Sequence, residues 1–197
     1  MSETGGIERF DPRPSPSHFD AIAGNVVFAI AGPLLHNYLL PRDCPRVTYY
    51  ANPDTSAEDR NRFLGGSGAT HVIAMEGDWF RCVNTTVLYC YEFSPDTFSL
   101  LDEVAGYYIS YAPVIPIAVR RIDNIFDELL TRGHIELRVL PELRTLGNAV
   151  IASTLSYSLI RMRNAKWAPS AAPAASASCE SAPARSGEPV TPLPPAF

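Results

Sequence analysis

Residues 37–47 hold the densest group of side chains in the sequence that could bind a ligand or take part in catalysis. The group consists of Tyr38, Arg42, Asp43, Cys44 and Arg46. Pro41 and Pro45 stand on either side of the Asp43-Cys44 pair, and proline restricts both its own φ and the residue before it. The segment is therefore expected to be stiff, and extended or turned. Rigid connections between packed elements often carry binding groups, so this segment is the first candidate site.

Arginine side chains in and near this segment suggest a site for an anion. A guanidinium makes charge-assisted and often bidentate hydrogen bonds to carboxylate and phosphate. Five arginines are candidates for one clamp: Arg13, Arg42, Arg46, Arg161 and Arg163. In the alternative reading, Arg42 and Arg46 form structural ion pairs with Asp43 and its neighbours. The arginines at 161–163 would then only complement a helix C-terminus.

Two residues near the prolines are candidates for catalysis. Cys44 lies between arginines, which favour its thiolate and hence a nucleophile, although a free cysteine is more often a small buried filler. His36, and with it His18, is a candidate general base because histidine titrates near neutral pH. No partner for a catalytic triad is identifiable, so a surface or capping role is the alternative for both histidines.

Further side chains are candidates for contact with the ring of a ligand. Tyr38, Tyr108 and Ser110 could stack on such a ring or form hydrogen bonds with it, or serve only as packing residues. Gly65-Gly66-Ser67-Gly68 follows a predicted helix instead of preceding one, which favours a turn over a phosphate loop. The four cysteines lack the C-x-x-C spacing of a zinc site. We therefore predict no metal site, and no cofactor is indicated.

Composition limits the classes of function. The chain has 197 residues, 46% hydrophobic and 19% charged, which suits one globular domain with appendages. A net charge of -5 argues against a general nucleic-acid binder, which needs a basic stripe. No run approaches the ~20 apolar residues of a membrane span, and residues 1–20 lack the apolar core of a signal peptide. A cytoplasmic protein with reduced thiols is expected.

Hydrophobic patterning predicts strands and helices in mixed order. The expected strands are 25–30, 46–50, 70–75, 87–93, 107–110, 115–122 and 135–140. The expected helices are 55–64, 94–101, 123–132 and 143–163, the last interrupted near Gly147. Thr55 and Glu58 fit a capping box, and Ser94-Pro95 fits an N-cap followed by proline at the first helical position.

These elements favour a single α+β domain over a doubly wound one, because there is no regular βαβ alternation and no G-x-G-x-x-G. We expect a mixed, mainly antiparallel sheet with several short helices. Residues 1–20 are expected to form an extended arm and residues 21–164 the domain. Residues 165–197, rich in Ala, Pro and Ser, are expected to be a disordered tail.

Several segments resemble a family of small proteins known only as a domain of unknown function. They are residues 9–18, 37–47, 62–66, 152–155 and 160–165, and the resemblance covers most of residues 7–165. Members of that family begin with a short strand of Leu-Tyr-His type before the segment matching Ser2-Glu3. This chain begins at Met1, where that strand would end, so either the start is misplaced or this member has lost the edge element and its histidine.

The segments from Val27 to Pro113 are also similar to ADP-ribosyltransferase-like folds, which bind nicotinamide dinucleotide between two small sheets. Two hypotheses about function remain open, and neither settles whether the protein is an enzyme. In the first, the protein binds or transforms an anionic small molecule or nucleotide in an arginine-lined cleft. In the second, it is a non-catalytic accessory or interaction protein of a metabolic pathway, for example one for secondary metabolites. The oligomeric state is not indicated.

Overall fold

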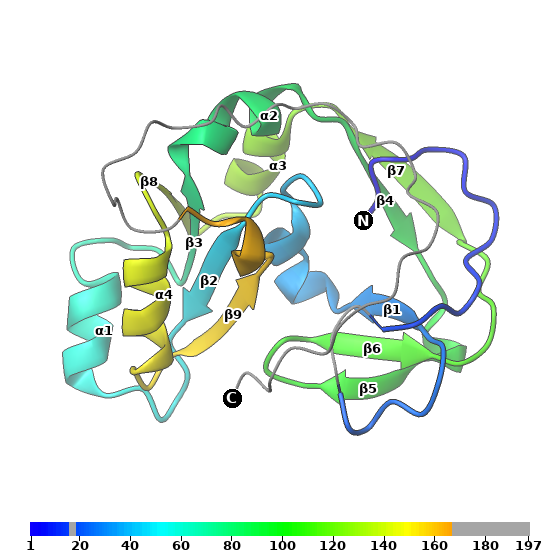
Figure 1. Cartoon of the computed structure of the whole chain (residues 1–197), viewed down its shortest axis with the longest axis horizontal. Helices are drawn as coiled ribbons and strands as arrows, with labels where there is room; N and C mark the ends of the chain where they lie inside the picture. The colour runs from blue at the N-terminus through cyan, green and yellow to red at the C-terminus, as the bar shows by residue number, and fades with distance from the viewer. Residues whose placement is uncertain (16–18, 167–197) are drawn as a thin grey trace.

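The computed structural model describes residues 1–15 and 19–166 and has the predicted α+β architecture (Figure 1). Its strands are β1 (Val27–Ile30), β2 (Arg46–Tyr50), β3 (His71–Glu76), β4 (Leu88–Glu92), β5 (Ser99–Asp102), β6 (Tyr107–Ser110), β7 (Ala118–Ile122), β8 (Ile135–Leu140) and β9 (Ser156–Ile160). Its α-helices are α1 (Ala57–Leu64), α2 (Phe80–Thr85), α3 (Ile125–Thr131) and α4 (Arg144–Ile151). Short 3-10 helices are η1 (Gly32–Tyr38), η2 (Gly77–Trp79), η3 (Pro95–Thr97) and η4 (Met162–Asn164).

The strands form three small sheets in place of the one predicted sheet. The largest has the order β8-β3-β2-β9, with β2 antiparallel to both neighbours and β3 parallel to β8. A second sheet has the order β1-β6-β5, and β4 pairs with β7 alone. Figure 1 shows α1 and α4 beside the largest sheet and the β1-β6-β5 sheet as a separate layer, with η1 between them.

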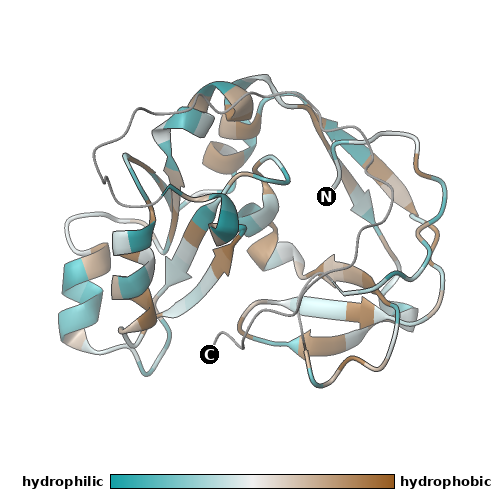
Figure 2. Cartoon of the chain, in the orientation of Figure 1, coloured by the Kyte–Doolittle hydropathy of each residue, from teal (hydrophilic) through white to brown (hydrophobic). Residues whose placement is uncertain are grey.

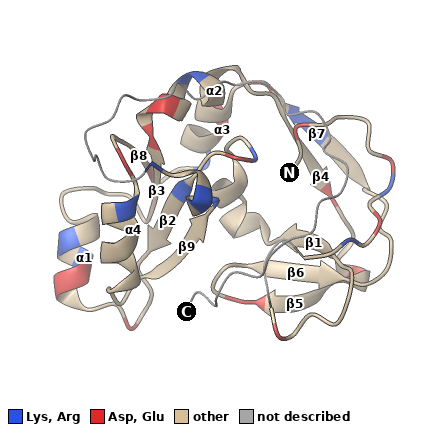
Figure 3. Ribbon diagram, in the orientation of Figure 1, with Lys and Arg blue, Asp and Glu red and all other residues tan. Residues whose placement is uncertain are grey.

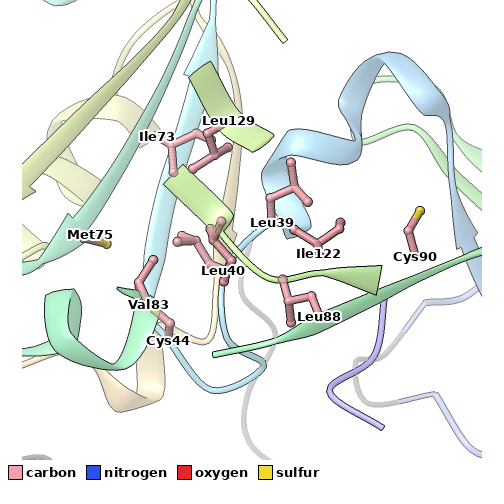
Figure 4. Close-up of a cluster of buried hydrophobic side chains, with 11 residues drawn as sticks. Leu39, Leu40, Cys44, Ile73, Met75, Val83, Leu88, Cys90, Ile122 and Leu129 are labelled. Carbon is pink, nitrogen blue, oxygen red and sulfur yellow. The ribbon is translucent and has the colours of Figure 1, made fainter. Parts of the chain in front are cut away.

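Each face of the largest sheet covers its own apolar core, because side chains alternate along a strand. Val47 and Tyr49 of β2 pack with Phe63 of α1 and Val150 of α4. Figure 2 shows both hydrophilic and hydrophobic residues in α1 and α4, as expected of helices with one face on a core. The side chains of the other cluster, which contains Ile73, are drawn in Figure 4: Leu39, Leu40, Cys44, Met75, Val83, Leu88, Cys90, Ile122 and Leu129.

Two of the predicted helices are wrong. After Ser94 the chain makes only η3 and then strand β5, because residues 99–102 gain a partner in β6. The last predicted helix ends at Ile151, and residues 156–160 form strand β9 against β2. In both cases pairing with a distant strand outweighs local helix propensity.

Three smaller features also differ from the predictions. The 3-10 helix η2 and helix α2 occupy residues 77–85, for which no element was predicted. The N-cap of α1 is Ser56, whose side chain accepts from the Asp59 amide, and Thr55 instead bonds Asn52. The described part of the chain continues beyond the predicted domain end to Lys166, whose amide donates to Glu76. The rest of the predicted tail lies outside the described residues.

The N-terminal segment, residues 1–15, runs past β4 and reaches the start of β1. It forms isolated bridges at Ser2 with Tyr89 of β4 and at Phe10 with Val114. No helix in residues 1–15 and 19–166 has the length and apolar character needed to cross a bilayer.

The position of Ile73 in the core predicts that Ile73→Ala strongly destabilises the fold. Ile73 has no exposed surface, so removing its side chain should lower the free energy of unfolding by about 2–5 kcal/mol. Ile117→Ala is the matched control, because Ile117 is 70% exposed and its loss should change stability by less than about 0.5 kcal/mol. Urea denaturation monitored by circular dichroism measures both, and equal effects would contradict this placement of the core.

Candidate functional site

The 3-10 helix η1 positions the first candidate side chains. Pro33 occupies its first turn, where a missing N–H costs nothing. The helix is held against the β5–β6 turn, since the Ala31 amide donates to the Gly106 carbonyl. Gly106 has φ +68, and a Cβ there would lie 2.9 Å from Leu34 Cδ1. Only glycine allows this close approach, so the sequence at 106 fixes where η1 lies.

Arg46 is the most deeply buried cation of the candidate set. Its side chain begins at the first residue of β2 and is 2% exposed. Nε donates to the carbonyl of Asn37, and Nη1 donates to the carbonyls of Pro41 and Cys44. Nη2 makes no hydrogen bond within the described residues.

Neither Arg46 nor Arg42 forms an ion pair within the described residues. This contradicts the alternative prediction of structural pairs with Asp43 and other carboxylates. Burial is the main cause that lowers the pKa of the Arg46 guanidinium, and the charge of nearby Arg161 adds to it. The arrangement is therefore a buried cation balanced by carbonyl dipoles and not by a carboxylate.

Arg161 lies close to Arg46, and Arg42 and Arg163 lie close to Arg161. The Arg161 Nε donates to the Arg42 carbonyl at 3.2 Å, and the Asn164 side chain donates to the Asp43 carbonyl at 2.7 Å. These bonds join η4 to the loop before β2, and Figure 3 shows the blue ribbon at the end of β9 beside that loop. Burial, and then the charges of Arg163 and Arg42, lower the pKa of Arg161. The nearest carboxylate is Asp43, whose oxygen is 3.8 Å from Arg161 Nε and whose side chain is mostly exposed.

Two tyrosines complete this arginine cluster, which we define as Tyr38, Arg42, Arg46, Tyr107, Arg161 and Arg163. The Tyr38 hydroxyl donates to the Tyr107 hydroxyl, and Arg46 Cζ lies 5.5 Å from the Tyr38 ring centre. Burial raises the pKa of Tyr38, so its hydroxyl is protonated at neutral pH. The Tyr38 hydroxyl is therefore a neutral group beside the arginines.

Tyr107 was not predicted, whereas Tyr108 and Ser110 were. Side chains alternate along β6, so Tyr108 and Ser110 point to the opposite face from Tyr107. The Ser110 hydroxyl bonds the backbone of Ala112, two residues away, which gives it a local structural role. The dipeptide Tyr107-Tyr108 was visible in the sequence, but only the pairing with β1 shows which ring faces η1.

Cys44 lies in the core beneath this cluster. Its side chain has no exposed surface, and burial raises the pKa of its thiol to about 12. The thiol therefore stays protonated at neutral pH in spite of the neighbouring Arg46. This position argues against the predicted nucleophile and agrees with the alternative of a buried filler.

His36 lies in a separate hollow of about 400 Å³. The hollow is lined by residues of η1, by the start of β3 and by the turn before β8, including His71, Arg132 and His134. The His36 and His71 rings are in edge-to-face contact, with centres 4.6 Å apart. Burial, and then the neighbouring His71, lower the pKa of His36 to about 4. The structure thus separates His36 from the arginines, to which it was expected to be close.

Arg13 is also separate from the arginine cluster. Its backbone pairs with Val26, which continues the edge of β1 beyond the Val27–Ser110 pair. Tyr107 pairs with Ile30 at the other end of β1. The register therefore places Arg13 at the far end of this sheet from the cluster. The other predicted histidine, His18, lies outside the described residues.

The hydrogen bonds of Arg46 predict that replacing it destabilises the fold far more than replacing Arg42 of the same loop. Arg46→Met removes a donor from three buried carbonyls, of which that of Pro41 keeps the Cys44 amide, so the free energy of unfolding should fall by about 3 kcal/mol. Arg42→Met removes an exposed side chain and should change stability by less than about 0.5 kcal/mol. Chemical denaturation measures both variants, and a tolerated Arg46→Met would show that the carbonyls do not need this donor.

The lowered pKa of His36 predicts a loss of stability in acid. The unfolded chain binds a proton at His36 near pH 6.5 and the folded chain only near pH 4. Stability is therefore complete above pH 6.5 and falls by about 3 kcal/mol as the pH drops from 6.5 to 4. His36→Phe should remove most of this dependence, while His134→Asn, an exposed control, should retain it. Thermal unfolding measured across this pH range would contradict the assignment if His36→Phe kept the wild-type slope.

The comparisons with known proteins identify a family but no activity. A family model described as a family of unknown function (DUF6886) matches residues 1–165. No curated protein and no solved structure matches the chain. The expected similarity to ADP-ribosyltransferase-like folds consequently has no support.

Proposed function

Since the chain belongs to DUF6886, a family of unknown function, we propose from its own geometry that it binds a small anionic molecule at the arginine cluster. The single observation that carries this proposal is Arg46. It is a buried guanidinium with no carboxylate partner within the described residues, and its Nη2 makes no hydrogen bond there. An anion at Nη2 supplies the missing counter-charge.

Electrostatics favours the anion. Removing a cation from water is costly unless it is paired and hydrogen-bonded. Three carbonyls meet part of this cost for Arg46, but Arg161 then adds a second positive charge close to it. The exposed carboxylate of Asp43 is one negative charge against several arginines. A phosphate or carboxylate between Arg46 and Arg161 would relieve this repulsion through charge-assisted hydrogen bonds.

The two tyrosines extend the same site. The Tyr38 and Tyr107 hydroxyls are hydrogen-bonded to each other, so together they keep one O–H donor for a ligand. Tyr107 also contacts the rings of Phe19 and Phe28, both half-buried. The cluster therefore offers cations, a neutral donor and an aromatic edge, which suits an anion with an attached ring such as a nucleotide. We propose binding and not a reaction, because Cys44 is buried as a thiol and His36 contacts His71 instead of the arginines.

A thermal-shift titration at low ionic strength tests the proposal. The probes are inorganic phosphate, pyrophosphate, adenosine monophosphate and succinate. A probe at 100 times its dissociation constant should stabilise the folded chain by about 2.7 kcal/mol. Arg161→Met should weaken binding of that probe at least about tenfold, since a hydrogen bond to a charged group contributes about 1.5–3 kcal/mol. Each variant is compared with its own ligand-free melting temperature.

Arg121→Met is the matched control for Arg161→Met. Arg121 is an exposed arginine on β7 that pairs with Asp123, away from the cluster. Binding unchanged in both variants would place the anion elsewhere. No shift with any probe would reject the proposal and favour the non-catalytic interaction protein, in which the arginines only hold the loop together.

A further inference from the structure

The histidine hollow defined above has features of a second binding site, independent of the arginine cluster. Its volume of about 400 Å³ lies within the range of small-molecule pockets. Three elements distant in sequence supply its walls: η1, the start of β3 and the turn between α3 and β8. Polar side chains and apolar ones such as Pro33 and Ile135 share the lining.

His36 contributes a buried nitrogen without a partner. The residue is 4% exposed, and its Nε2 forms no hydrogen bond. The ring also bonds the backbone of Pro33, which has only a carbonyl to offer, so the ring N–H is on Nδ1. Nε2 therefore carries a lone pair and accepts. A buried acceptor without a partner is destabilising, which calls for a functional explanation.

The neighbouring His71 ring packs edge-to-face against the His36 ring, and its Nδ1 is 3.0 Å from the Thr70 hydroxyl. His71 is only half-buried. Because His36 Nε2 is buried, a ligand donor reaches it only when a neighbouring side chain moves. Turning the His71 ring would cost its hydrogen bond to Thr70 and its contact with the Tyr50 ring.

Arg132 contributes one net positive charge to the hollow. Its Nε and Nη2 donate to Glu128, whose carboxylate also accepts two hydrogen bonds from Arg120. Two arginines thus share one carboxylate, and the Arg132 Nη1 makes no hydrogen bond within the described part of the chain. Gly133 and His134 both have left-handed φ, 67° and 51°, and so turn the chain sharply after Arg132.

We propose that the hollow binds a small hydroxy carboxylate. Its hydroxyl donates to His36 Nε2, and its carboxylate accepts from Arg132 Nη1. The single net charge of the Arg120, Glu128 and Arg132 group favours a monoanion over a phosphate dianion. The acceptor at His36 selects a ligand that carries a donor beside its anionic group.

Titration of the full chain with three matched probes, followed by nuclear magnetic resonance of the backbone amides and imidazole rings, tests the proposal. Lactate has the hydroxyl and the charge, propionate lacks the hydroxyl, and lactamide lacks the charge. Lactate should bind in the millimolar range, as suits a ligand of so few atoms, and should shift the His36 and His71 signals. Propionate and lactamide should each bind at least about tenfold more weakly.

Variants separate this site from the arginine cluster. His36→Phe keeps the ring shape and removes an unpaired nitrogen, so the fold should persist while lactate binding is lost. Arg132→Met should have the same effect on binding, whereas Arg161→Met, in the arginine cluster, should leave it unchanged. Equal binding of lactate and propionate would overturn the role of His36. Loss of lactate binding in Arg161→Met alone would assign the ligand to the arginine cluster, and absence of lactate binding would overturn the proposal.

Discussion

The buried guanidinium of Arg46 is the interaction on which the central part of the structure depends. Its three acceptors, the carbonyls of Asn37, Pro41 and Cys44, all belong to the connection between η1 and β2. Prolines at 41 and 45 remove two N–H groups from that connection. The Pro41 carbonyl also accepts from the Cys44 amide, whereas the described part of the chain gives no backbone donor to the buried carbonyls of Asn37 and Cys44, which therefore need a side-chain donor. Arginine meets this need because its donors are fixed in one plane, which lysine would not reproduce.

The same constraint produces the electrostatic character of the site. Once Arg46 holds the loop, the Arg42 and Asp43 carbonyls become the acceptors that join the loop to η4. Arg161 adopts φ 56°, a conformation that costs a non-glycine residue of the order of 1 kcal/mol. Hydrogen bonds thus hold Arg46 and Arg161 close together against their mutual repulsion. This concentration of like charges is the basis of the anion site that we propose.

The sequence predicted the class of fold and most elements but not their assembly. Strands such as 46–50 and 135–140 were predicted to the residue, because β-branched, aromatic or alternating side chains identify them locally. Strands β5 and β9 were missed, since they exist through their partners β6 and β2. The convergence of Tyr38, Arg42, Arg46 and Arg163 was predictable in part, because three of them share one rigid loop region. Strand register decides that Tyr107 and not Tyr108 faces the arginine cluster. The positions of His36 and Arg13 away from that cluster likewise depend on how the strands pair, so none of these could be predicted.

The position of η1 explains why neighbouring residues serve two different sites. A 3-10 helix has three residues per turn, so side chains two positions apart diverge by about 120°. His36 therefore meets His71 of the largest sheet, while Tyr38 meets Tyr107 of the β1-β6-β5 sheet and the Arg46 guanidinium. An α-helix, with 3.6 residues per turn, would point these two side chains in different directions. Since Gly106 fixes one end of η1 and Arg46 the other, both sites depend on a single rigid element. A ligand that displaced η1 at the arginines would therefore also move His36, which provides a physical route for coupling between the two sites.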